Sequence, residues 1–396
     1  MTSPNEQTRR EMDLAIIGAG NTGAPLVELA AHIPGVGGII VCDPGVYVEK
    51  DLRGQLITPR DLGRNKANVQ GQRLRAMNPA LRVRVLTEPV ERLPLGELRA
   101  DVILAAVDTK IARLAISLAA WRLNSVFVDT GVAGADLRVR VNVYRPGPDA
   151  ACLMCAWGPR DLEQVEQRYP CQGAAPSAPA TNAPAALGAL AASLAALECE
   201  KLLSGRAERA LIGRQVLVDA LWQKHYVTTY TRNPQCPFPH EIWDIEELPG
   251  APAMCLGDLL ALGAAAPGSD ATVTMRVAGS HFVSAMTCRA CGRKKQLLRL
   301  EASLGAAALE CRCGGEMVAA GFDRLEQLDL STLPAQLLQR PLRRLGLRHR
   351  DVVTVSGAGE ERHFELVADA AGAAEPGAGN CEAAQSMSRG GPEGKE

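Results

Sequence analysis

The sequence has few aromatic residues, almost no net charge and no long apolar run. Phe, Trp and Tyr make up 4% of its 396 residues. The 43 Lys and Arg residues nearly balance the 44 Asp and Glu residues, which argues against a dedicated nucleic-acid-binding protein, since such a protein shows a basic excess. The best candidate for a membrane span, residues 183–197, is mostly Ala and too short. Because residues 1–12 are polar and lack the apolar run of a secretory signal, we expect a cytoplasmic protein with no membrane or nucleic-acid partner.

The sequence does contain a large apolar fraction and many cysteines. Hydrophobic residues make up 47% of the chain, enough for a sizeable core, and the length suits two or three domains. The 12 cysteines include CxxC and CxC pairs. In a long chain without a secretory signal, this clustering is typical of metal-binding thiolates in a reducing compartment rather than of disulfides.

The first part of the chain has the alternating pattern of an α/β protein. Five segments have the pattern of strands: 13–17, 38–43, 82–86, 101–107 and 125–129. Helical periodicity occupies residues 24–32 and 111–123. Strands that alternate with helices predict a Rossmann-like, doubly wound and mostly parallel sheet covered on both faces.

The pattern changes after this first part. Residues 137–144 alternate strictly between polar and apolar, as in a strand with one solvated face. A loop is expected over 173–184, then a helix over 184–203 that stops at Gly205. Paired strands are expected at 215–219 and 226–230.

We divide the chain into three parts. Residues 1–240 form a nucleotide-binding domain, and residues 241–369 form a C-terminal α+β domain that contains a Cys-rich segment. In this second domain we expect a helix over 256–262 and strands at 273–277 and 351–355. Residues 370–396 are mostly Gly, Ala, Glu and Ser, and their composition predicts a disordered tail.

A glycine-rich turn follows the first expected strand. Gly18, Gly20 and Gly23 have the GxGxxG spacing that lets backbone N–H groups approach a phosphate at the start of a helix. Asp43 lies 20 residues after Gly23, at the end of the second strand, where it can accept hydrogen bonds from ribose hydroxyls. The pattern predicts a nucleotide site; the alternative is a glycine turn that only lets the helix pack on the sheet.

Residues beyond the turn favour ATP over a nicotinamide cofactor. The polar and basic segments 49–55 and 61–67 come soon after Asp43. Asp108, Lys110 and Arg113 follow the expected strand at 101–107, at the sheet edge where doubly wound folds bind ligands. Cations near a triphosphate neutralise its charge, and a carboxylate in the same crevice can hold Mg²⁺, whereas hydride transfer needs neither.

Separated motifs follow one another in order over about residues 10–240: the glycine turn with Asp43, the segments 49–55 and 63–67, Asp108 to Arg113, Cys152-x-x-Cys155, residues 187–205, and Arg232 to Cys236. Together they resemble the ThiF/MoeB family of enzymes that activate ubiquitin-like proteins. The resemblance implies a ThiF-type adenylyltransferase. Such an enzyme uses Mg·ATP to adenylate the C-terminal carboxylate of a ubiquitin-like or sulfur-carrier protein ending in Gly-Gly, and releases pyrophosphate.

The resemblance also implies site residues and partners. Asp43 would bind the ribose, Lys66 the phosphates and Asp108 the magnesium, with Arg53 and Gln55 as further candidates beside the phosphates. Family members are commonly homodimers, and some hand the activated partner to a conjugating enzyme.

This chain departs from the family pattern at three places. The family usually has Asn-Leu-x-Arg-Gln where this chain has 51–55, so Arg53 stands one position early and Gly54 occupies the position of the arginine. The second CxxC pair of the family is replaced by Cys236 and His240, with Pro239 at the usual position of the fourth cysteine. The region after 240 is longer than in minimal members.

The first group of cysteines suggests a structural zinc site. Cys152 and Cys155 place two thiolates on one turn, and their partners must come from a distant segment. We predict that Cys236 and His240 complete the site. The alternative for His240 is an ordinary surface histidine.

A second group of cysteines predicts a zinc ribbon. Cys288 and Cys291 precede Cys311 and Cys313 by about 20 residues, and Gly or Arg residues follow each pair. We expect a structural or partner-docking role for this metal, because zinc stabilises small regions with thin cores.

Cys171 is the candidate for a nucleophile. It lies in the stretch after the first CxxC, where the resemblance places the reactive or mobile-loop cysteine of the family. The alternative is an inert thiol, because no general base is identified nearby.

Two other functions stay open. The first is a catalytically weak scaffold that keeps the ThiF fold and binds a ubiquitin-like partner, which Gly54 motivates. The second is an NAD-dependent dehydrogenase, but hydride transfer does not require the polar motifs after Asp43.

Overall fold

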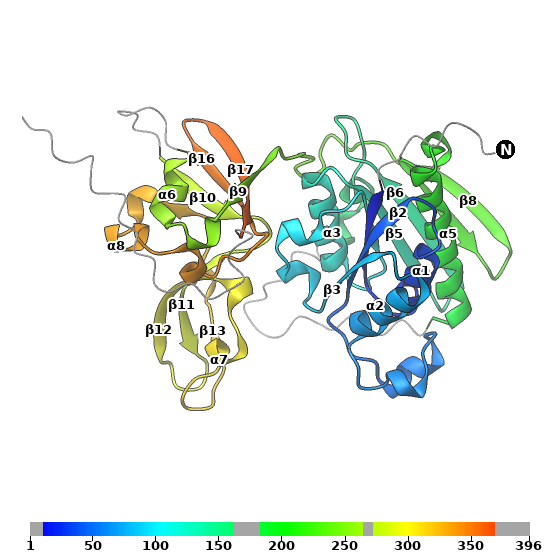
Figure 1. Cartoon of the computed structure of the whole chain (residues 1–396), viewed down its shortest axis with the longest axis horizontal. Helices are drawn as coiled ribbons and strands as arrows, with labels where there is room; N and C mark the ends of the chain where they lie inside the picture. The colour runs from blue at the N-terminus through cyan, green and yellow to red at the C-terminus, as the bar shows by residue number, and fades with distance from the viewer. Residues whose placement is uncertain (1–10, 162–182, 264–271, 369–396) are drawn as a thin grey trace, which may run out of the picture. The chain divides into compact units, whose positions relative to one another are not determined.

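The computed structural model describes residues 11–161, 183–263 and 272–368 (Figure 1). The chain divides into two compact units. Unit 1 comprises residues 1–93 and 98–243, and unit 2 comprises residues 94–97 and 244–396. Cys171 and the tail 370–396 lie outside the described residues.

Unit 1 is built on an eight-stranded sheet with the order β3-β2-β1-β4-β5-β6-β7-β8. The strands are β1 (Met12–Ile17), β2 (Val36–Cys42), β3 (Arg82–Leu86), β4 (Val102–Ala105), β5 (Val126–Ala133), β6 (Arg138–Tyr144), β7 (Arg214–Asp219) and β8 (Lys224–Thr229). The first five strands in this order, β3-β2-β1-β4-β5, are parallel to their neighbours. The pairs β5-β6, β6-β7 and β7-β8 are antiparallel. The sheet is therefore mixed, with its doubly wound half at the N-terminal end of the chain.

Helices cover both faces of this sheet. They are α1 (Gly23–Ala30), α2 (Lys66–Met77), α3 (Lys110–Arg122) and α5 (Ala185–Leu203). Helices α1, α2 and α5 lie on one face and α3 on the other (Figure 1). The Ala-rich side of α5 is buried against α1 and β6, with Ala191, Ala192 and Ala195 fully inaccessible. Small side chains allow this close approach. The Ala-rich segment that is the best candidate for a membrane span in the sequence is therefore part of a helix that packs in the core.

Unit 2 combines two small sheets with short helices. One sheet has the order β15-β10-β16-β17-β9, and in the other β11 pairs with β12, β13 and β14. The strands are β9 (Ile245–Pro249), β10 (Thr274–Val277), β11 (Phe282–Cys288), β12 (Lys294–Leu300), β13 (Met317–Val318), β14 (Arg324–Leu325), β15 (Leu328–Asp329), β16 (Val352–Gly357) and β17 (Glu360–Val367); the helices are α6 (Leu256–Ala261), α7 (Ala306–Leu309) and α8 (Ala335–Leu338). Leu256, Phe282 and Val353 belong to its separate apolar core.

Most expected elements of unit 1 are confirmed, with two informative differences. The strand expected over 101–107 ends at Ala105, because residues 106–109 turn away from the sheet to begin α3. Helix α2 was not expected. Its composition is mostly polar, and it begins at an N-cap, Asn65, whose side chain accepts a hydrogen bond from the Asn68 N–H at 3.0 Å. Within the described residues, no helix combines the length and apolar character needed to cross a membrane.

Candidate functional site

Two of the three motif glycines are required by the packing of the turn after β1. Gly18 has a φ of +97°, and a Cβ there would lie 2.3 Å from the carbonyl oxygen of Ala106. A Cβ at Gly23 would lie 1.8 Å from the carbonyl oxygen of Gly18. At Gly20, by contrast, a Cβ would meet nothing closer than the Gln55 side chain at 3.8 Å. The turn is therefore sterically fixed at its two ends and open in the middle, where a ligand can approach the backbone.

Asp43 is fixed beside this turn by two backbone groups. Its Oδ2 accepts a hydrogen bond from the Ala19 N–H at 2.7 Å, and its Oδ1 accepts one from the Gly45 N–H at 2.7 Å. The carboxylate thus joins the end of β2 to the glycine turn. Each carboxylate oxygen has a second lone pair, so the group can also accept hydrogen bonds from two ribose hydroxyls.

Lys66 is the first residue of α2 and points toward polar partners. Its Nζ lies 3.4 Å from Oδ2 of Asp51 and 3.4 Å from Oε1 of Gln55. The Gln55 side chain in turn donates to Oδ1 of Asp51 at 2.7 Å. The Lys66 ammonium group therefore has Asp51 as its single carboxylate partner, and a phosphate in the adjoining cavity can compete with Asp51 for this ammonium group.

These residues line one cavity of about 1650 Å³. Seven of the residues predicted to bind nucleotide or act in catalysis face it: Gly18, Gly20, Asp43, Arg53, Gln55, Lys66 and Asp108. Gly23 is not among them, since it packs under the turn. Arg53 is exposed, and its side chain has no ion pair or hydrogen bond among the described residues. Asp108 is also exposed, one residue before Thr109, whose side chain caps α3.

Sequence reasoning missed the polar wall at the other end of this cavity. Asp129 on β5 is fully buried and accepts hydrogen bonds from Arg113, from Nη1 of Arg140 at 2.7 Å and from Asn142 at 3.0 Å. Burial alone would raise the pKa of Asp129, but the two guanidinium groups hold it below its ordinary value, so the carboxylate is charged. Two features of the sequence could have indicated this wall: an Asp inside an apolar strand, and the Arg residues of the alternating segment 137–144.

Aromatic residues continue the wall beyond Arg140. Tyr144 stacks on Tyr230 with ring centroids 5.7 Å apart. The Tyr230 hydroxyl donates to Oε1 of Gln215 at 2.8 Å. All three residues line the cavity, which therefore extends from the glycine turn to β7.

Gly54, at the position of the family arginine, contacts the glycine turn through its backbone. The side-chain amide of Asn21 donates to the Gly54 carbonyl and, at 3.1 Å, to the carbonyl of Ala183. One amide thus joins the turn, the segment 49–55 and the start of α5. No guanidinium takes the place of the family arginine at this position, although Arg53 next to it lines the same cavity.

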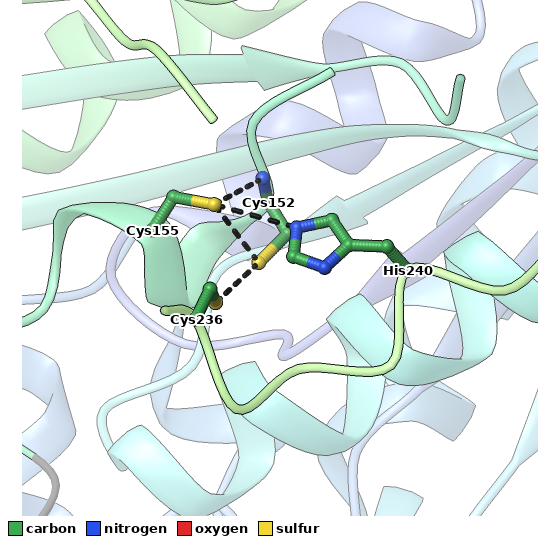
Figure 2. Close-up of side chains that lie close together, drawn as sticks. All are labelled: Cys152, Cys155, Cys236 and His240. Carbon is green, nitrogen blue, oxygen red and sulfur yellow. Dashed lines mark hydrogen bonds between the residues drawn. The ribbon is translucent and has the colours of Figure 1, made fainter. Parts of the chain in front are cut away.

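The first predicted metal site is assembled from two distant segments (Figure 2). The Sγ atom of Cys152 lies 3.7 Å from that of Cys155 and 3.7 Å from that of Cys236, and Nε2 of His240 lies 3.3 Å from Sγ of Cys155. Tetrahedral zinc with bonds of about 2.3 Å to sulfur places its thiolates about 3.8 Å apart. The spacing of the four side chains therefore fits zinc.

The surroundings of His240 orient its ring toward the thiolates. Its Nδ1 lies 2.7 Å from the carbonyl oxygen of Phe238, so the tautomer with a proton on Nδ1 donates there and leaves Nε2 free to bind metal. Trp121 and Phe238 contact the ring edge to face. Burial lowers the pKa of His240, which also favours the neutral ligand form. The structure brings His240 into the cluster rather than leaving it as a separate surface histidine.

The second group of cysteines also comes together. Sγ of Cys288 lies 3.6 Å from that of Cys313, and Sγ of Cys291 lies 3.8 Å from that of Cys311. Cys288 ends β11, and a hydrogen bond from the Cys291 N–H lowers the pKa of its thiol to about 6. These distances are again those of a tetrahedral thiolate site.

The two isolated cysteines that the structure describes in unit 1 have no comparable setting. Cys42 and Cys199 are buried in the apolar interior, and burial raises the pKa of the Cys199 thiol to about 12. Both are packing residues, as expected.

The chain is similar to proteins named as activating enzymes or adenylyltransferases. The chain is 27% identical over 230 residues to the SAMP-activating enzyme E1 of Haloferax volcanii, a match that covers 57% of this chain and 78% of the relative. It is 29% identical over 203 residues to the sulfur carrier protein ThiS adenylyltransferase of Escherichia coli, covering 50% and 75% of the two chains. It is 30% identical over 243 residues to a sulfur carrier protein adenylyltransferase of Thermus thermophilus, covering 59% and 84%.

Among solved structures, Escherichia coli MccB with ATP aligns with a TM-score of 0.45 at 20% identity, covering 58% of this chain and 67% of that one. The model of the ThiF family matches residues 2–238, which hold the glycine turn, Asp43, Lys66, Asp108 and the first cysteine cluster. This match covers more than half of the chain, and the protein therefore belongs to the ThiF family.

Proposed function

We propose that this protein uses Mg·ATP to adenylate the C-terminal carboxylate of a ubiquitin-like or sulfur-carrier protein that ends in Gly-Gly. The observation that carries the proposal is the single cavity shared by the glycine turn, Asp43, Lys66 and Asp108. The named relatives are activating enzymes or adenylyltransferases, which gives the scaffold and dehydrogenase alternatives no support.

The residues of the cavity suit the chemistry of acyl-adenylate formation. A carboxylate oxygen of the partner attacks the α-phosphorus, the bond from that phosphorus to the bridging oxygen of the β-phosphate breaks, and pyrophosphate leaves. Asp43 binds the ribose, and Lys66 moves from Asp51 to the phosphates to stabilise their charge. Asp108 is the candidate ligand for magnesium, which would neutralise charge on the phosphate oxygens. The partner supplies the nucleophile, so no catalytic base is needed.

Pyrophosphate exchange tests this proposal. A carrier protein ending in Gly-Gly should support exchange of labelled pyrophosphate into ATP, and Lys66→Ala and Asp108→Ala should each abolish it. Lys295→Ala, an exposed lysine on β12 of unit 2, is the matched control and should leave exchange unchanged. Absence of exchange with every carrier protein tested, while ATP still binds, would support the scaffold alternative instead.

We also propose that each cysteine cluster holds a structural zinc ion. The first cluster joins the segment after β6 to the segment after β8. The second supports the small sheet around β11, where a thin core gains stability from a metal. In both, the ligand spacing is the supporting observation.

We propose that the chain forms a homodimer through the exposed edge strand of the large sheet. Every residue of β8 is exposed, and the apolar side chains of Trp222 and Val227 are 69% and 59% accessible. An exposed antiparallel edge strand with apolar side chains is suited to pair with a second copy. Val227→Glu should convert the dimer to a monomer in light scattering, whereas Thr228→Glu, next to it on β8, should have a smaller effect.

A further inference from the structure

Arg140 lies on the cavity wall, where the residue opposite it leaves space for its side chain. It lies on β6 directly opposite Gly131 of β5. A Cβ at Gly131 would lie 2.7 Å from Nε of Arg140 and 3.1 Å from its Cζ. The guanidinium thus lies over bare backbone, and any side chain at position 131 would displace it.

The charges around Arg140 leave an excess of one positive charge. Asp129 is shared by Arg140 and Arg113, so two cations face one buried carboxylate. Asp129 raises the pKa of Arg140, which keeps the guanidinium charged. The charge pattern of this wall therefore favours an anion in the adjoining cavity.

The two arginines differ in what remains available for a ligand. Arg113 uses Nη1 for Asp129 and for the Thr130 carbonyl, and Nη2 for the Val107 carbonyl. Within the described part of the chain, the side chain of Arg140 makes one hydrogen bond, from Nη1 to Asp129. Its side chain is 34% exposed and lines the cavity, so its Nε and Nη2 donors are free to bind a carboxylate as a bidentate pair.

The sheet gives the distance from this group to the reacting end of the substrate. Asp108 follows β4, and β6 lies two strands further along the sheet. Strands are spaced by about 4.8 Å, so β6 lies roughly 10 Å across the sheet from β4, a separation that about three residues of extended chain span. With Asp108 beside the reacting phosphates in the proposed function, we take this as the approximate distance from Arg140 to the site of attack.

Resting on the proposed adenylation, we propose that Arg140 selects protein tails that carry an Asp or Glu about three residues before the reacting C-terminal carboxylate. The acidic side chain binds the free edge of the guanidinium while the terminal Gly-Gly reaches the nucleotide. Arg140 is thus a specificity-determining residue, whereas Asp129 and Gly131 position it.

Peptide binding tests this inference separately from catalysis. Two fluorescein-labelled hexapeptides ending in Gly-Gly, with Glu or Gln as the fourth residue from the C-terminus, are titrated with the full chain, Mg²⁺ and a non-hydrolysable ATP analogue. The Glu peptide should bind about tenfold more tightly than the Gln peptide. In Arg140→Gln this preference should disappear, and in Arg140→Lys part of it should return.

Arg138→Gln is the matched control. Arg138 lies on the same strand and lines the same cavity, but its charge is paired with Asp219 and Asp136. The preference for Glu should persist in this variant. The midpoint of thermal unfolding shows whether each variant is folded, and Arg140→Lys keeps the charge next to Asp129 should Arg140→Gln unfold.

Three outcomes would overturn the inference: equal binding of the two peptides, a preference that persists in Arg140→Gln, or no binding of either peptide. Pyrophosphate exchange with a full carrier protein is measured in parallel. Exchange without a peptide preference overturns only the role of Arg140. A preference without exchange supports the binding role of Arg140 and overturns the adenylation.

Discussion

The side-chain amide of Asn21 donates a hydrogen bond to the backbone carbonyl of Gly54, 33 residues further along the chain. Asn21 belongs to the glycine turn, and Gly54 occupies the position at which the ThiF/MoeB resemblance expects an arginine. The segment 49–55 is therefore held to the turn by its backbone. Lys50, the exposed Arg53 and Lys66 are the cations that this segment and α2 bring to the nucleotide end of the cavity.

Gly54→Arg should increase the rate of adenylation. Gly54 has a φ of −129°, which any residue adopts, and a Cβ there would lie 3.3 Å from the Ala183 carbonyl oxygen, a tight contact that a small shift relieves. An arginine at this position adds a cation beside the phosphates, and we expect roughly a tenfold gain in kcat from charge stabilisation. Steady-state pyrophosphate exchange measures it. Gly54→Ala separates the effect of charge from that of the Cβ, and an equal gain in both variants would contradict the electrostatic explanation.

Gly188→Ala should destabilise unit 1, although alanine is the better helix former by about 1 kcal/mol. A Cβ at Gly188 would lie 1.8 Å from Oδ1 and 2.5 Å from the backbone oxygen of Asn21, so α5 would have to move away from the turn. We expect a net loss of about 2 kcal/mol in the free energy of unfolding, measured in urea by tryptophan fluorescence, because all four tryptophans lie in unit 1. Ser193→Ala, on the exposed side of the same helix, should change it by less than about 0.5 kcal/mol. A more stable Gly188→Ala variant would show that the contact is loose.

The parts of the site that sequence predicts are those fixed by local geometry. The positions of Gly18 and Gly23 are set by the steric requirements of one turn. The spacing within each cysteine pair is set by the distance between two ligands of one metal ion. Asp43 follows from the usual length of a strand–helix–strand unit. In each case the spacing along the chain determines the arrangement in space.

The parts that sequence missed depend on pairing between strands or on tertiary packing. Asp129 and Arg140 meet only because β5 and β6 pair in one register, and Gly131 makes room for the arginine only in that register. Helix α2 has a weak apolar face, so its amphipathic pattern is faint although Asn65 caps it. Short strands such as β13 in unit 2 exist because neighbouring strands pair with them, and their own composition gives little sign of them.

Each cysteine cluster should hold one zinc ion independently of the other. The full chain should contain about two zinc ions by elemental analysis, since each cluster supplies four ligands. Cys236→Ser should lower the content to about one and destabilise unit 1, and Cys311→Ser should lower it to about one while leaving the tryptophan-detected unfolding of unit 1 unchanged. Cys199→Ala, a buried cysteine outside both clusters, is the control and should retain both ions. Loss of both ions in either single variant would contradict independent sites.

The charge of Asp129 should make unit 1 sensitive to acid. Its pKa in the folded protein is lowered by Arg113 and Arg140 against the effect of burial. A lowered pKa adds stability above the unfolded value of about 3.9, and this stability is lost as the pH falls through the lower folded value. Asp129→Asn leaves two partly buried guanidinium groups without their carboxylate, so at pH 7 it should cost about 3 kcal/mol in the free energy of unfolding. The difference from the unmodified chain should narrow as the pH falls below about 3.9, in urea titrations followed by tryptophan fluorescence. Asp136→Asn, at an exposed carboxylate, should lie close to the unmodified chain at every pH, and a constant gap for Asp129→Asn across this range would show that the carboxylate does not titrate with folding.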